Sequence, residues 1–221
     1  MIIVIDGPAG AGKSTTAREV ARRAGLDYVD SGAIYRAFTV LFNHYDKDQT
    51  RFLNSLDQHS MQFEFRLDQA RVLLDQKEIT DTIRMPQVND HVSEVAKMPV
   101  IRQRVREILQ NTSKNKKVIM EGRDLGTVVF PDAEIKFFLT ADARSRAQRR
   151  FDELQRNGET VSFEEVCRNV EKRDQIDSTR NIAPLRKADD AIVIDSSGMS
   201  FEEQVARILM YIDQYRTAKI Y

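Results

Sequence analysis

Short apolar runs alternate with amphipathic stretches along most of the chain. Between the runs, apolar residues recur at helical spacing, as at Ala17, Val20 and Ala24 in the stretch 14–24. The runs with the length of a buried strand are 2–5, 26–29, 117–120, 135–139 and 191–194. Strands whose two faces are both covered by helices have such continuous apolar sequences. The pattern therefore predicts an α/β fold with a central, five-stranded parallel sheet flanked by helices.

Two of the predicted helices have clearly marked N-termini. Ser162 and Ser200 each stand three residues before a glutamate, and this spacing allows the serine and the glutamate to cap each other's backbone N–H groups. After Ser200, one helical face is apolar and contains Phe201, Val205, Ile208, Leu209 and Ile212. We expect this helix to pack on the sheet.

One segment departs from the alternation of strands and helices. Residues 61–83 alternate between apolar and polar at period two, with turn-forming pairs between the runs, which predicts a small antiparallel meander. An antiparallel hairpin has no natural place within a series of parallel βα units. We therefore expect an inserted subdomain, and the sequence alone leaves open whether it serves the function or is a surface hairpin.

Charge and cysteine content restrict the classes of function. Lys plus Arg and Asp plus Glu both total 34 in 221 residues, so no broad electrostatic field exists to hold nucleic acid or an anionic membrane. No apolar stretch has the length of a membrane span, and the first strand begins without a basic leader. The single cysteine, Cys167, lies at helical spacing among apolar residues, where we interpret it as core filler. We expect one domain in a reducing cytoplasm.

The most specific chemical signal directly follows the first strand. Residues 7–15 match the phosphate-loop pattern GxxxxGK[ST], and a helix-forming stretch follows. Backbone N–H groups of such a loop curve around phosphate oxygens, and the helix N-terminus adds its positive end. Lys13, which we expect near solvent in the free protein, can reach the β- and γ-phosphates, and Ser14 is the expected magnesium ligand. The predicted ATP-binding residues are Gly7, Pro8, Ala9, Gly10, Ala11, Gly12, Lys13, Ser14 and Thr15.

Three further stretches contain residues suited to a phosphorylated substrate. Residues 30–36 (DSGAIYR) and 121–124 (EGRD) lie just past predicted strands, where open α/β sheets bind their ligands. Arg173, Asp177 and Arg180 are spaced by four and three, which predicts that they share one helical face. Any one of these arginines is more simply explained as a surface ion pair. Several arginines that converge on a phosphate loop, however, have a use in phosphoryl transfer.

These motifs resemble those of the bacterial cytidylate kinases, a family of nucleoside monophosphate (NMP) kinases. The resemblance covers nearly the whole chain, and its most specific parts are SGAIYR within 30–36 and GRDLGTVVFPD within 121–132. It implies a P-loop kinase fold with the antiparallel meander inserted in the NMP-binding region, and a helical lid. The implied divisions are a core of about 1–30, 85–142 and 180–221, an NMP-binding region of about 31–84, and a lid of about 144–179.

The resemblance also implies which residues read the base of the acceptor. Ser93, Arg102 and Asp124 match positions at which the family contacts cytosine. A carboxylate can accept a hydrogen bond from the exocyclic amine, and an arginine can donate to the ring carbonyl and N3. The full set of implied substrate-binding residues is Ser31, Arg36, Ser93, Arg102, Arg123, Asp124, Arg173, Asp177 and Arg180.

Further residues are implied at the phosphates and the ribose. Arg36, Arg123 and Arg180 match positions that hold the monophosphate, whereas Arg173 and Asp177 fall near the ribose and the phosphate. Asp177 is expected to accept a hydrogen bond from a sugar hydroxyl. The implied catalytic residues are Lys13, Arg123, Arg180, Arg146 and Arg150.

The lid is expected to supply arginines to ATP, and the candidates are Arg146, Arg149 and Arg150. Two positions depart from the family pattern. Glu121 replaces an aspartate and lengthens a carboxylate near the magnesium region, and Ile176 stands where an arginine is common. Neither change removes a group that the expected chemistry requires.

The implied activity is ATP-dependent phosphorylation of CMP, and of dCMP, by a monomer that uses magnesium. Two alternatives remain open. The first is another P-loop kinase with a small acceptor such as UMP, AMP or shikimate. The second is a nucleotide-dependent switch, which needs a guanine-reading Asn-Lys-x-Asp sequence, and residues 115–118 (NKKV) lack the aspartate.

Overall fold

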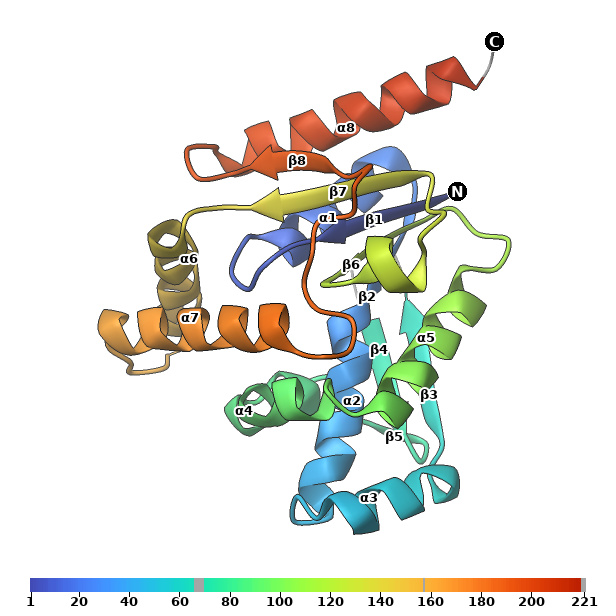
Figure 1. Ribbon diagram of the computed structural model, residues 1–221, viewed down its shortest axis with the longest axis vertical. Coiled ribbons are helices and arrows are strands. Elements are labelled where there is room, and N and C mark those ends of the chain that lie inside the picture. The colour runs from blue at the N-terminus through green and yellow to red at the C-terminus, as the bar shows by residue number, and fades with distance from the viewer. Residues whose placement is uncertain (66–69, 157, 220–221) are drawn as a thin grey trace.

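The computed structural model describes residues 1–65, 70–156 and 158–219. The central sheet has the strand order β2-β6-β1-β7-β8, and every neighbouring pair is parallel (Figure 1). Its strands are β1 (Ile2–Asp6), β2 (Asp27–Asp30), β6 (Val118–Gly122), β7 (Ile135–Thr140) and β8 (Ile192–Asp195). Each strand overlaps one of the predicted apolar runs, so the five-stranded parallel sheet is confirmed.

Helices cover both faces of this sheet. Side chains alternate along β1, so Ile3 and Ile5 contact one apolar cluster and Val4 contacts the other. The first cluster includes α1 (Lys13–Ala24) and α8 (Phe201–Ala218), and Ser200 caps α8 with the reciprocal bonds of a capping box. The second cluster includes α2 (Ser31–His44) and α5 (Pro99–Ser113). None of the described helices is long and apolar enough to cross a bilayer.

The inserted segment forms a separate antiparallel sheet with the order β3-β4-β5. Its strands are β3 (Met61–Phe65), β4 (Ala70–Leu74) and β5 (Lys77–Glu78), and residues 66–69 of the predicted meander lie outside the described residues. Ile79 and Ile83 pack with Val72 against Ala33 and Ala37 of α2. The meander is shorter than predicted, because the chain after β5 turns into a short 3-10 helix (Thr82–Arg84) instead of continuing as a strand.

Four helical segments complete the part of the molecule around α2. α3 (Gln49–Ser55) and a short 3-10 helix (Leu56–Gln58) lead into β3. α4 (Pro86–Val95) leads into α5, and Figure 1 shows α2, α4 and α5 beside the antiparallel sheet, below the central one. Apolar residues of α2, α3 and α5 and the last residue of α4, Val95, share one cluster with the central sheet. The antiparallel insertion is therefore anchored on helices that also reach the carboxyl ends of the central strands.

Two helices, α6 (Ala143–Arg156) and α7 (Phe163–Thr179), project beside the carboxyl ends of the central strands (Figure 1). They pack on one another through a small apolar cluster of their own, against which Cys167 also packs. Ser162 caps α7 by accepting from the N–H of Glu165. The helix ends at Thr179, and Arg180 has an extended backbone. The prediction that Arg180 shares a helical face with Arg173 and Asp177 is therefore wrong.

Candidate active site

The phosphate loop connects β1 to α1, and two of its glycines are required by their surroundings. Gly7 has φ 151°, and a Cβ built there would lie 2.0 Å from the carbonyl oxygen of Leu139 on β7. Gly10 has φ 74°, and its Cβ would lie 2.9 Å from the carbonyl oxygen of Arg146. A side chain at either position would force the loop away from its neighbours. The loop therefore packs closely against the backbone of β7 and α6, which restricts its conformation.

Lys13 lies inside this loop. Its side chain is buried, with only 4% of the residue exposed, and its Nζ donates to the carbonyl oxygen of Pro8 at 2.7 Å. Burial lowers the pKa of Lys13 to about 7, and the nearby guanidinium of Arg123 acts in the same direction. The expectation that Lys13 lies near solvent is therefore wrong, because the loop wraps around the ammonium group. The buried charge is available to an anion that enters the loop.

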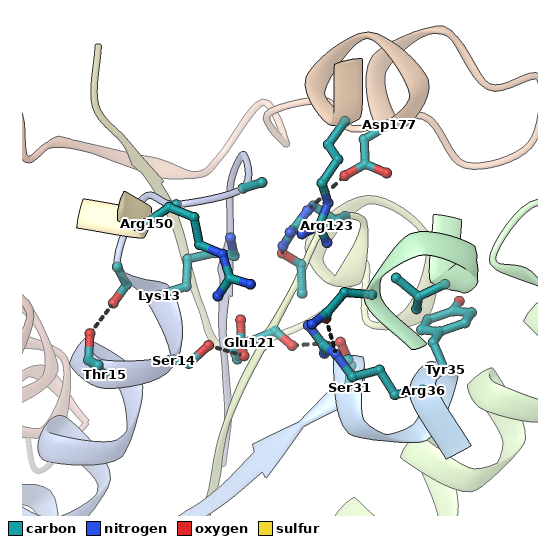
Figure 2. Close-up of a pocket in the computed structure, with 18 of the residues that line it drawn as sticks. Lys13, Ser14, Thr15, Ser31, Tyr35, Arg36, Glu121, Arg123, Arg150 and Asp177 are labelled. Atoms are coloured by element: carbon teal, nitrogen blue, oxygen red, sulfur yellow. Dashed lines mark hydrogen bonds and ion pairs between the residues drawn. The ribbon is translucent and has the colours of Figure 1, made fainter. Parts of the chain in front are cut away.

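Ser14, at the first turn of α1, faces a carboxylate at the end of β6. Its Oγ donates to Oε1 of Glu121 at 2.5 Å, and the hydroxyl of Tyr28 lies 3.4 Å from the same oxygen. Glu121 is buried and lies next to the phosphate loop (Figure 2). A hydroxyl and a carboxylate are oxygen donors of the kind that Mg²⁺ prefers, and such sites leave further positions for phosphate oxygens and water. The pair therefore fits a metal that arrives with a nucleotide.

Three arginines from separate elements approach each other opposite the phosphate loop: Arg36 from α2, Arg123 after β6, and Arg173 from α7. Arg123 donates from Nε to Oδ2 of Asp177 at 3.0 Å, and Arg36 donates from Nε to Oδ1 of Asn89 at 3.4 Å. The Nε of Arg173 is buried and has no hydrogen-bond partner among the described residues. Burial, reinforced by Arg123 and Arg36, lowers the pKa of Arg173 to about 10. This excess of buried positive charge favours an anion.

The predicted cytosine-reading residues meet at Asp124. Arg102 on α5 donates to Oδ2 of Asp124 and also, at 3.1 Å, to the carbonyl oxygen of Ala96. Arg180 donates to Oδ1 of Asp124 at 3.0 Å. It reaches Asp124 from the extended backbone after α7, and not from the helical face on which it was predicted. Burial raises the pKa of Asp124, although both arginines oppose this shift. Ser93 on α4 lines the same cavity.

The predicted lid arginines differ in what they contact. Arg146 is buried beneath the phosphate loop, donates to the carbonyl oxygen of Ala9 at 3.0 Å and pairs with Asp174 at 2.5 Å. Arg149 donates to the carbonyl oxygen of Ala11 at 3.2 Å and lines the cavity. Arg150, paired with Glu153 at 2.8 Å, points into the space between Lys13 and Arg36 in Figure 2. The contacts of Arg146 are those of a residue that positions the loop.

One cavity of about 780 Å³ connects these groups. It runs from the phosphate loop past Glu121 and Arg123 to Asp124, and Figure 2 shows Ser31, Arg36 and Tyr35 across the pocket from Lys13. Ser31 donates from Oγ to the carbonyl oxygen of Glu121 at 2.6 Å. Of the predicted substrate-binding residues, only Arg102 is missing from the lining, and it stands behind Asp124.

The sequence analysis did not single out two buried carboxylates at this edge of the sheet, Asp30 and Asp6. Asp30, at the end of β2, accepts from the N–H of Ala33 at 2.9 Å and pairs with Arg84 at 2.6 Å, and Arg84 also lines the cavity. Asp6, at the end of β1, accepts from two backbone N–H groups. The available signal was their position, because each is an acidic residue directly after an apolar run.

Solved structures share this architecture at low sequence identity. An uncharacterized protein from Eubacterium ventriosum is 16% identical, with a TM-score of 0.55 over 96% of this chain and 98% of its own. The shikimate kinase from Bacteroides thetaiotaomicron is 12% identical, with a TM-score of 0.50 over the same shares. At this identity the likeness shows the fold alone, which this chain shares with both proteins.

Sequence comparison is more specific. The family model for cytidylate kinase matches residues 3–214. A cytidylate kinase from Carboxydothermus hydrogenoformans is 45% identical over 96% of this chain and 97% of its own, and one from Phocaeicola vulgatus is 43% identical over 91% and 92%. The resemblance stated from the motifs is confirmed: the chain belongs to the cytidylate kinase family.

Proposed function

We propose that the protein transfers the γ-phosphoryl group of ATP to CMP, and to dCMP, to give ADP and CDP or dCDP. The observation that carries this proposal is the buried cluster of Arg36, Arg123 and Arg173, which faces a phosphate loop across one cavity. Two phosphorylated ligands fit such a cavity, one on the loop and one on the arginines. Family membership supports cytosine as the base of the acceptor.

On the donor side, the backbone of residues 7–12 and the first turn of α1 bind the phosphates of ATP. Lys13 neutralises charge on the β- and γ-oxygens, and Arg150 approaches the transferring group from the lid. Arg146 and Arg149 act indirectly, because their guanidinium groups hold the loop carbonyls of Ala9 and Ala11.

On the acceptor side, Asp124 accepts from the exocyclic amine of cytosine while Arg102 and Arg180 hold its carboxylate. Ser93 lies beside them on α4 and completes the base site. Asp177 accepts from a ribose hydroxyl while its other contacts fix Arg123. Arg36, Arg123, Arg173 and Arg180 surround the phosphate that is attacked, with Ser31 beside them.

Magnesium is the metal that fits the donor set. Ser14 and Glu121 would hold it directly or through water, next to the phosphate loop. When bound with ATP, it supplies positive charge at the β- and γ-oxygens. The longer side chain of Glu121, relative to aspartate, reaches the Ser14 hydroxyl across the cavity floor.

The transfer is direct and in line. The attacking oxygen of CMP needs no general base, because the second pKa of a phosphate monoester is about 6 and the oxygen is already anionic at neutral pH. The protein contributes by positioning the two phosphates and by closing residues 144–179 over ATP, which excludes water from the transferring group. The acceptor region comprises about residues 31–84, and the core comprises about 1–30, 85–142 and 180–221. We propose that the enzyme acts in the cytoplasm as a monomer.

The decisive experiment is a panel of nucleoside monophosphates assayed with ATP and magnesium by coupled detection of ADP. We expect CMP and dCMP to have the highest kcat/KM and UMP and AMP to be poor acceptors. A higher kcat/KM with UMP, AMP or shikimate would contradict the proposed acceptor. ATP hydrolysis that none of these acceptors stimulates would contradict the kinase assignment.

A further inference from the structure

Asp6 has no role in the chemistry described so far. It is buried next to Leu125, which lines the cavity. It is the last residue of β1 and only 4% exposed. Its Oδ1 accepts from the backbone N–H of Leu125 at 3.0 Å, and its Oδ2 accepts from that of Gly126 at 2.7 Å. Both carboxylate oxygens are thus committed to one short stretch of backbone more than a hundred residues away in the chain.

That stretch is a single π-helical turn, Leu125–Val129, which we call the π-turn. The turn is closed by Phe130, the next residue, whose N–H donates to the carbonyl oxygen of Leu125 at 2.7 Å. The first N–H groups of any helical turn have no acceptor within the turn, and here Asp6 supplies both acceptors. π-helical turns are rare in proteins, and those known within α-helices occur frequently at functional sites. Asp6 therefore binds the first two N–H groups of this turn.

Asp124 is the residue immediately before the π-turn, and its carbonyl oxygen accepts from the N–H of Val128 at 2.9 Å. We propose that Asp6 is a positioning residue for acceptor recognition: it fixes the start of the π-turn and thereby the place of the Asp124 carboxylate between Arg102 and Arg180. The inference rests on the proposed role of Asp124 in reading cytosine. Asp6 itself touches no substrate.

A different role for the same carboxylate would have the opposite kinetic signature. Asp6 directly precedes Gly7, and its charge also acts on Lys13. If Asp6 served the phosphate loop, its loss would weaken the use of ATP. If it positions Asp124, its loss weakens the use of CMP and relaxes the choice of base. The two KM values therefore distinguish the roles.

The first test is Asp6→Asn. The amide keeps the shape of the carboxylate but turns an NH₂ group toward one of the two backbone N–H groups, so the π-turn must shift. We expect KM for CMP to rise about tenfold, the change that follows when one hydrogen bond at the base is lost. The CMP:UMP ratio of kcat/KM falls, while KM for ATP stays within about twofold of wild type. Glu134→Gln is the matched control, because Glu134 accepts from the N–H of Ile2 at 2.6 Å at the opposite end of β1.

The second test is Gly126→Ala, which changes the π-turn partner of the Asp6 carboxylate and leaves the carboxylate itself intact. A Cβ there would lie 3.2 Å from Lys136 Cδ, 3.3 Å from Val4 Cγ2 and 3.4 Å from Oδ2 of Asp6, so the π-turn and these side chains must move slightly apart. We expect the same rise in KM for CMP and the same fall in the CMP:UMP ratio. If Asp6→Asn does not fold, this variant alone decides.

Each outcome supports or overturns the inference. An unchanged KM for CMP in the folded variants, or a rise confined to KM for ATP, overturns it. So does an equal loss on CMP and UMP, which would show that Asp6 serves stability alone. Wild-type enzyme assayed in parallel separates the two proposals. If it prefers another acceptor to CMP, the proposed function has failed, and the inference about Asp6, which rests on it, is overturned with it.

Discussion

Buried charged side chains gather where the central strands end. Asp6, Asp30, Glu121 and Asp124 are each at most 6% exposed, and each carboxylate receives hydrogen bonds from backbone N–H groups, hydroxyls or arginines. Burial of an ionised group is costly unless it is paired. Arg173, whose Nε has no partner among the described residues, is the exception, and a phosphate would supply the missing acceptor.

Replacing Lys13 tests the donor side. We expect Lys13→Met to lower kcat at least about a hundredfold, because it removes positive charge from the developing transition state. The methionine fills the buried channel, so the melting temperature should change little. Steady-state assays at saturating CMP measure this effect, and Lys77→Met, at an exposed position on β5, is the control. Wild-type turnover by Lys13→Met would contradict the role of the loop.

Replacing Arg180 tests the acceptor side. Its side chain is only 5% exposed and bonds to Asp124, which is shared with Arg102. A hydrogen bond to a charged group contributes roughly 1.5–3 kcal/mol, so Arg180→Ala should lower kcat/KM for CMP by tens-fold or more. Binding of ATP, measured by calorimetry without CMP, should remain close to that of wild type. Equal losses for both nucleotides would move Arg180 to the donor side.

Replacing Asp124 tests how cytosine is chosen over uracil. In the proposed complex the carboxylate would accept from the cytosine amine, whereas uracil would present a carbonyl at that position, an unpaired contact that costs about 1–3 kcal/mol. In Asp124→Asn the amide can donate or accept, so we expect the CMP:UMP ratio of kcat/KM to fall, mainly through loss on CMP. Asp57→Asn, at an exposed ion pair with Arg104, is the control. If the ratio is unchanged while both substrates slow, cytosine is read elsewhere.

The sequence could predict those site residues whose signal is local. The phosphate loop is one continuous motif, and Arg36, Arg123 and Asp124 lie in short motifs just past apolar runs. The roles of Asp6 and Arg146 depend on backbone groups far away in the chain, at Leu125 and Ala9, which no local pattern reveals. The burial of Lys13 escaped prediction for the same reason, because it results from how the loop folds back on itself.

The periodicity of apolar residues was sufficient to predict which regular helices and strands exist, but not where they end. Buried parallel strands have unbroken apolar sequences, so all five central strands could be predicted. The end of α7 depends on tertiary contacts, because Arg180 bonds to Ala183 and Asp124 only from an extended backbone. The sequence contains a signal for a new element after the meander that was not used. Pro86 disfavours helical backbone at Met85 and is itself favoured at the first position of a helix, where it begins α4.

The contact between the antiparallel sheet and α2 should be important for both stability and acceptor binding. Ile83 is fully buried in the cluster that joins the insertion to α2, the helix that carries Arg36. Ile83→Ala should lower the free energy of unfolding by roughly 2–5 kcal/mol and raise KM for CMP more than KM for ATP. Urea denaturation and steady-state assays measure the two effects. Val193→Ala, at a half-exposed position on β8, should change stability by less than about 0.5 kcal/mol.

The pKa of Asp6 predicts how the stability of the whole molecule depends on pH. Burial raises it to about 6 from an ordinary value of 3.8. The folded state therefore holds this proton more tightly than the unfolded state, and the resulting stability is fully present below about pH 3.8 and lost as the pH rises through about 6. A shift of about two units corresponds to roughly 3 kcal/mol.

Asparagine does not titrate, so Asp6→Asn isolates this contribution. Between pH 3.5 and 7, the wild-type free energy of unfolding should decline relative to that of the variant by roughly 3 kcal/mol. Urea denaturation of both proteins at several pH values measures this difference. If the difference is constant over this range, the carboxyl does not carry the raised pKa.

The central place of β1 has a consequence for synthesis on the ribosome. Ile2 pairs with Val118 and β1 also pairs with β7, so both neighbours of this strand are translated long after it. At about 5–20 residues per second, the 116 residues from Ile2 to Val118 take roughly 6–23 seconds to translate. During that time an apolar strand waits without its partners. Nascent chains that stall before β6 should therefore be especially dependent on chaperones, and slow codons in the acceptor region would lengthen this exposure.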